Sequence, residues 1–186
     1  MICTNNSRKG VIILSIKTIF PLKDAYVSQY YPSQNFGQSA YLYISQYQQT
    51  GDDYRSLLQF SLASIPPRRR IVSARLQLRI YRNEIPAGSR IRASVRRNLG
   101  SWRESTVTWN KQPASNLLYR FWISSAQSRG SIINLDLTSL VRRWYNRQTP
   151  NYGIAIRGNE ARNSLLGFYG IESSRAPRLI INYSRN

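Results

Sequence analysis

A regular alternation of apolar and polar residues constrains the fold of this chain more than any other feature. In the segment 71–81 one set of positions is apolar: Val72, Ala74, Leu76, Leu78 and Ile80. The intervening positions are polar or charged, and include Arg75, Gln77, Arg79 and Tyr81. Successive side chains of a strand point to opposite faces, so the pattern predicts a strand with one buried face. Segment 90–96 repeats it, with Ile91, Ala93 and Val95 between Arg90, Arg92, Ser94 and Arg96.

Further short segments of strand character are separated by turn residues along the chain. They are residues 11–20, 41–45, 55–62, 131–134, 153–157, 165–169 and 178–183. Eight to ten short strands at this spacing predict an all-β fold, a sandwich of two antiparallel sheets. One short helix is expected near residues 137–146, because Leu137, Leu140, Val141 and Trp144 follow helical spacing behind a capping Asp136.

The composition argues against most catalytic chemistry. The chain has no His, one Cys and 8 acidic residues, so a His-based triad, a His-ligated metal and a structural zinc site are excluded. No suitable pair of carboxylates can be named, and we expect no enzyme activity and no cofactor. Four acidic residues could together hold Ca²⁺, namely Asp24, Asp52, Asp53 and Glu172, but their spacing does not resemble a calcium loop and no metal is predicted.

The net charge of +19 comes almost entirely from arginine, which supplies 23 of the 27 basic residues. Arginine can donate two parallel hydrogen bonds to a carboxylate or phosphate group, so a polyanion is a candidate partner. Consecutive strands usually pair, which would gather one basic sheet face from Arg75, Arg79, Tyr81, Arg90, Arg92 and Arg96. The alternative is a solvated outer face that prevents sheets from sticking together. No sequence-specific nucleic-acid motif is present.

The N-terminal segment contains a short apolar run over residues 11–16. Lys17 ends this run, so it is too short for a membrane span, and no signal-peptide cleavage site follows. We expect a first strand here, and it could pair with another subunit by strand addition. The candidate intersubunit residues are Cys3, Val11, Ile12, Ile13, Leu14 and Ile16.

A series of motifs runs in one order from Asp24 to about residue 184. It includes Asn35-Phe36-Gly37, Arg55-Ser56-Leu57-Leu58-Gln59-Phe60, Trp102-x-Glu104-x-Thr106-Val107-Thr108-Trp109-Asn110-x-x-Pro113, and Asn151-Tyr152-Gly153. The order resembles the DNRLRE family of bacterial and archaeal surface modules. The resemblance implies a jelly-roll-like β-sandwich over residues 24–186, behind an extension of residues 1–23. It also implies kinship with carbohydrate-binding modules, which form a branch of that family.

The tryptophan motif of residues 102–113 permits two interpretations. Trp102 and Trp109 with Glu104 and Asn110 could bind a sugar, since aromatic and polar groups together do so. The same residues suit a structural corner in which Glu104 and Asn110 bond to loop amides. The structural interpretation is favoured.

Two functions follow from these observations. The first is a non-catalytic structural protein that self-assembles through its N-terminal strand into a fibre or coat at a cell or spore surface, by an unidentified export route. The alternative is a carbohydrate-binding module that holds acidic polysaccharide on an Arg- and Tyr-rich sheet face.

Overall fold

The computed structural model describes residues 14–184, which form eleven strands and one helix. The first strands are β1 (Leu14–Ile19), β2 (Lys23–Ser28), β3 (Tyr41–Gln46) and β4 (Asp53–Gln59). They are followed by β5 (Arg70–Asn83), β6 (Arg90–Asn98), β7 (Ser115–Ser124) and β8 (Ile132–Asp136). The helix α1 (Thr138–Tyr145) precedes β9 (Ile154–Arg157), β10 (Leu166–Tyr169) and β11 (Arg178–Ser184).

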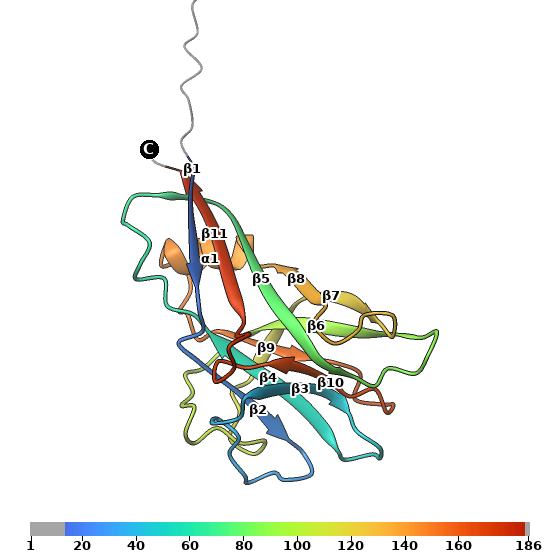
Figure 1. Ribbon diagram of the computed structural model, residues 1–186. Coiled ribbons are helices and arrows are strands. Elements are labelled where there is room, and N and C mark those ends of the chain that lie inside the picture. Colours follow the sequence, from blue (N-terminus) through green and yellow to red (C-terminus); the bar gives the residue numbers. More distant parts are fainter. Residues whose placement is uncertain (1–13, 185–186) are drawn as a thin grey trace, which may run out of the picture.

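All the strand pairs are antiparallel, and hydrogen bonding joins them into one curled sheet (Figure 1). The strand order is β1-β11-β5-β10-β3-β4-β9-β6-β7, with β2 added on β4 and β8 on β5. The expected all-β class with one short helix is therefore confirmed for residues 14–184. Two separate sheets in a jelly-roll arrangement are not confirmed, because β10 and β3 connect the two arms of a single sheet.

One hydrophobic core fills the concave side of the curled sheet. The alternation on β5 and β6 determines which side chains enter it: Ala74, Leu76, Leu78 and Ile80 from β5, and Ile91, Ala93 and Val95 from β6. Val72 was expected to join them but is exposed, and Ile71 is buried in its place. The register between β5 and β11 shifts at this point. Ser73 lies opposite Asn182 and Ile71 lies opposite Tyr183, so Val72 has no opposite residue on β11. A β-bulge of this kind reverses the facing of the residues beyond it.

The strands β5 and β6 are consecutive in the chain but are not neighbours in the sheet. Four strands, β10, β3, β4 and β9, lie between them in the hydrogen-bonded order. The expected single basic face from both strands is therefore wrong. Because the inner residues of both strands enter the same core, their arginines point away from it from different parts of the sheet.

The N-terminal strand pairs within its own chain. All six residues of β1 are in register with β11, from Leu14 opposite Ser184 to Ile19 opposite Leu179. The expected donation of this strand to another subunit is corrected for Leu14 and Ile16, which occupy positions in the chain's own sheet. The other intersubunit candidates, Cys3 and Val11, Ile12 and Ile13, lie outside the described residues.

The helix α1 lies against β5 with its expected apolar stripe inward, and Leu137, Leu140, Val141 and Trp144 are all buried. Asp136 lies one residue before the helix cap position and accepts a hydrogen bond from the Thr138 N–H at 2.8 Å. From the exposed side, Arg142 donates to the carbonyls of Ile71 and Val72, both at 2.8 Å. The helix is thus fastened to the bulged start of β5.

The tryptophan motif forms a second, smaller core on the convex side of β2 and β4. Trp102 and Val107 pack there against Ala25, Val27 and Leu57. The Glu104 carboxylate accepts a hydrogen bond from the Asp24 N–H, and the Trp102 ring N–H donates to the Tyr152 carbonyl. The Asn110 side chain donates to the Ser33 hydroxyl, where a bond to a loop amide was expected. These contacts support the structural interpretation of the motif.

Candidate functional site

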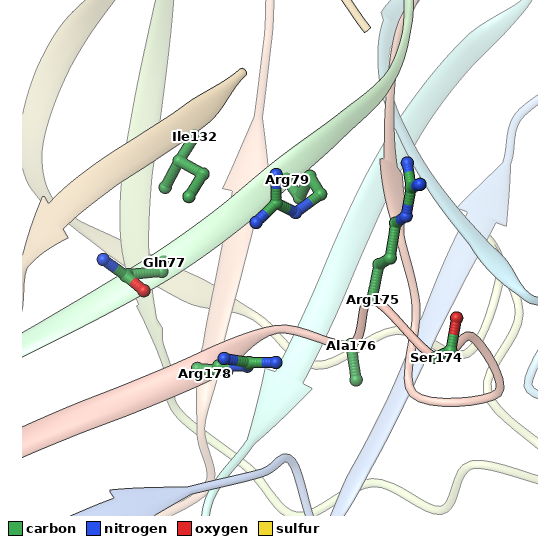
Figure 2. A pocket seen from close by; sticks show the side chains of 7 residues that line it. All are labelled: Gln77, Arg79, Ile132, Ser174, Arg175, Ala176 and Arg178. Carbon is green, nitrogen blue, oxygen red and sulfur yellow. The ribbon is translucent and has the colours of Figure 1, made fainter. Parts of the chain in front are cut away.

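A basic hollow opens on the convex side of the sheet, where β5, β8 and the loop before β11 meet (Figure 2). Its volume is about 340 Å³, within the range of small-ligand sites. The lining residues are Gln77, Arg79, Ile132, Ser174, Arg175, Ala176 and Arg178. Gln77 and Arg79 reach it because they occupy the outward positions of the alternating strand β5, whose inward residues fill the core.

A row of four tyrosines lies beside the basic hollow, on the outward positions of β5, β10 and β3. Tyr41 and Tyr81 are stacked with ring centroids 3.8 Å apart, and Tyr169 meets Tyr81 edge-on at 5.5 Å. Tyr43 continues the row at 6.4 Å from Tyr41. We call Tyr41, Tyr43, Tyr81 and Tyr169 the tyrosine row.

Gly167 makes room for this row. A side chain at Gly167 would begin 2.9 Å from the ring of Tyr43, closer than side-chain carbons pack, so the ring lies over bare backbone. The register of β10 against β5 also shifts between Gly167 and Phe168.

Arginines connect the basic hollow to the tyrosine row. Arg129 and Arg175 both donate to the Tyr169 hydroxyl at 3.3 Å. The bond from Arg129, with the positive charge of both arginines, holds the pKa of Tyr169 below its usual value. The guanidinium of Arg129 also lies 5.2 Å from the centre of the Tyr81 ring. The Tyr169 hydroxyl thus faces a positive field that would equally attract a ligand carboxylate.

The arginines of the basic hollow carry no carboxylate partner within residues 14–184. The ion pairs in that part of the chain join Arg55 to Glu160 and Arg82 to Glu84, both elsewhere on the sheet. Arg79 donates to the Gly130 carbonyl at 2.7 Å, which fixes the side chain but leaves its charge unbalanced. An anion is the chemical complement of such a site.

The six residues predicted to form one basic face lie on separate parts of the sheet. Arg79 lines the basic hollow and Tyr81 belongs to the tyrosine row. Arg75 lies further along β5, opposite Asp136 on β8. The Thr138 hydroxyl and N–H, followed by the nearby charges of Arg75 and Arg142, lower the pKa of Asp136. The remaining three, Arg90, Arg92 and Arg96, lie on β6, away from the hollow.

A comparison with protein families identifies the type of module. The model of carbohydrate-binding module family 96 matches residues 15–183. The chain belongs to this family. The match supports the expected kinship with carbohydrate-binding modules, while the narrower resemblance to the DNRLRE family is not confirmed. No curated protein matches the sequence.

The family 96 match begins at residue 15, within β1, so it includes a strand that precedes Asp24. Carbohydrate-binding module families are typically non-catalytic, which is consistent with the expectation that this chain has no enzyme activity. Among residues 14–184 no three acidic or Cys side chains come together in a way that could hold a metal ion. The helix of this part of the chain is also too short and too polar to cross a membrane.

The sequence analysis did not predict several residues that the structure places in the basic hollow or beside it. Tyr169, Arg129, Arg175 and Arg178 come from loops and strand ends remote from β5 in the sequence. The pairing of β10 and β11 with β5 brings Tyr169, Arg175 and Arg178 to Arg79, and the pairing of β8 with β5 brings Arg129. The sequence contains two local signals for an outward aromatic row. Tyr41 and Tyr43 alternate with Leu42 and Ile44, and Tyr81 occupies an outward position of the alternating segment 71–81.

Proposed function

We propose that this family 96 module is non-catalytic and binds acidic polysaccharide in the basic hollow and along the tyrosine row. The observation that carries the proposal is the unbalanced charge of Arg79, Arg175 and Arg178 beside stacked tyrosines. A sugar ring can lie against a tyrosine face while a carboxylate on that ring accepts two parallel hydrogen bonds from an arginine guanidinium group. Uronate sugars present both groups at once.

A location outside the cell or on its surface agrees with this function, because acidic polysaccharides are found there and modules of this kind commonly act there. Self-assembly through the N-terminal strand forms no part of the proposal, since Leu14 to Ile19 already pair with β11. Plain attraction between polyanions and a +19 protein is the competing explanation for any binding.

The test compares Arg175→Gln with Arg103→Gln, because each removes one exposed positive charge and only the first lies in the basic hollow. Affinity for oligogalacturonate is measured by calorimetry at about 0.15 M salt, where screening limits long-range attraction. A hydrogen bond to a charged group contributes about 1.5–3 kcal/mol, so Arg175→Gln should weaken binding about tenfold or more.

Arg103→Gln should change the affinity less than twofold, and a neutral xyloglucan oligosaccharide should bind far more weakly than the uronate. An equal loss of affinity in the two variants would show that the net charge of the protein, and not the basic hollow, accounts for the binding. Equal affinity for the neutral sugar would contradict the proposed role of the arginines.

A further inference from the structure

A second basic surface lies on the convex side of the strands β6, β7 and β9. Its centre is Trp122 on β7, which is directly opposite Arg92 on β6. Arg90 lies two positions along the same face of β6, and Arg120 two positions along β7. We call Trp122, Arg90, Arg92 and Arg120 the β6–β7 face. The sequence prediction named two of its arginines but not the tryptophan.

Trp122 is exceptionally exposed for its residue type. It has 54% of its surface accessible, whereas Trp102 and Trp144 have 6% and 5%. The guanidinium carbon of Arg90 lies 4.4 Å from its ring centre and that of Arg92 lies 5.9 Å away. A large aromatic ring left in water beside two guanidinium groups is typical of a binding surface, because aromatic residues and arginine contribute most to binding energy.

The adjoining strand β9 adds a further arginine to this side of the sheet. Arg157 lies opposite Arg55 on one side and Ser94 on the other. Burial, followed by the positive charges of Arg55 and Arg96, lowers the pKa of Arg157 to about 10. The carboxylate beside this cluster, Glu160, is already paired with Arg55 at 2.7 Å. A bound anion would relieve this mutual repulsion of arginines.

The β6–β7 face cannot be a continuation of the basic hollow along the sheet. Its strands are separated from β5 by β10, β3, β4 and β9 in the hydrogen-bonded order. The inner residues of β6 and β7 and those of β5 pack into the same core, so the outward sides of the two regions lie across that core from each other. An oligosaccharide of a few sugars can therefore contact only one of the two surfaces.

We propose that the β6–β7 face is a second binding surface for acidic polysaccharide, and that one module can therefore bridge two polysaccharide chains. This inference rests on the proposed function for the ligand class, but the site, its residues and the bridging are separate claims. Trp122 would stack on a sugar ring, and Arg90 and Arg92 would hold the carboxylate of that ring or its neighbour.

The first test counts binding sites with a short oligogalacturonate at about 0.15 M salt. Calorimetry of the full chain should give two sites per molecule, and Trp122→Ala should weaken one of them at least tenfold while the other is unchanged. Arg175→Gln should weaken only the other site. Because Trp122 is exposed, its replacement should leave the thermal unfolding midpoint unaltered, and Arg92→Gln serves as a second variant of the same face.

The second test measures bridging with long polygalacturonate. The unaltered protein should produce turbidity or a gel at a stoichiometric ratio, whereas Trp122→Ala and Arg175→Gln should each bind the polymer without cross-linking it. Fluorescence adds a local reading, since bound oligogalacturonate should protect Trp122 from quenching by acrylamide.

The outcomes separate the two proposals. One site per molecule, lost in Arg175→Gln and unchanged in Trp122→Ala, would overturn the second surface and leave the proposed function standing. No binding of oligogalacturonate by either surface would overturn both. If a short single-stranded DNA protected Trp122 as well as the uronate did at equal charge, the assignment of this face to polysaccharide would be wrong.

Discussion

The buried carboxyl of Asp24 should make the stability of this protein fall as the pH rises. Asp24 is 1% exposed on β2. Its Oδ2 accepts the Ile171 N–H at 2.8 Å, while its Oδ1 is buried with no hydrogen-bond partner in the described chain. Burial, aided by the nearby Glu104 and Glu172 charges, raises the pKa of Asp24 from 3.8 to about 7. The folded protein therefore holds a proton at Asp24 that the unfolded chain releases.

The magnitude follows from this difference in pKa. One pKa unit corresponds to 1.36 kcal/mol, so a shift from 3.8 to about 7 amounts to about 4 kcal/mol of stability. Below about pH 4 the carboxyl is protonated in both states and the contribution is fully present. Between about pH 4 and pH 7 it is lost, because the folded protein must then bury a charge.

Replacing Asp24 with asparagine should remove this pH dependence. Asparagine keeps an oxygen to accept the Ile171 N–H but carries no charge. We expect Asp24→Asn to raise the free energy of unfolding by up to about 4 kcal/mol near pH 8 and to change it little near pH 4. Urea unfolding followed by tryptophan fluorescence across this pH range measures the difference.

The matched control is Asp136→Asn, whose sign should be opposite. The pKa of Asp136 is lowered by its bonds from Thr138, so its contribution is present at neutral pH and lost as the solution becomes acidic. Asp136→Asn should therefore destabilise the protein at neutral pH and have a smaller effect at low pH. A difference between wild type and Asp24→Asn that stayed constant from about pH 4 to pH 8 would refute the reasoning.

Two further predictions concern the packing of the fold. Gly37→Ala should lower the free energy of unfolding by about 1–3 kcal/mol, because the new side chain would begin 2.3 Å from the Glu104 carbonyl oxygen; Gly100→Ala, which meets no atom within 4 Å, should be near neutral in the same urea titration. Deleting residues 1–19 removes β1 and the buried Ile19 and should cost at least about 2 kcal/mol; an unchanged thermal unfolding midpoint would show that β1 contributes nothing to the sheet.

Local sequence patterns were sufficient to predict buried and exposed positions where these simply alternate along one strand or follow the turns of one helix. The alternation on β5 and β6 correctly separated core positions such as Leu76 and Val95 from outward arginines, and the spacing from Leu137 to Trp144 correctly gave the helix. The pattern failed at Val72, where a bulge shifts the register, and it missed β7, in which Leu117-Leu118 and Phe121-Trp122 interrupt the alternation. It also missed β2, whose residues are buried on both faces of the sheet.

The sequence by itself determined that the chain forms an antiparallel β-fold with one helix, and which faces of its clearest strands carry arginine. Both follow from the two-residue period of a strand, which is a local property of the backbone. Only the tertiary structure decided that Arg79 joins Arg175 and Tyr169, while Arg90 and Arg92 join Trp122 on a separate surface. Strand order depends on pairing between segments far apart in sequence, such as β5 with β10 and β11, and no local periodicity encodes it.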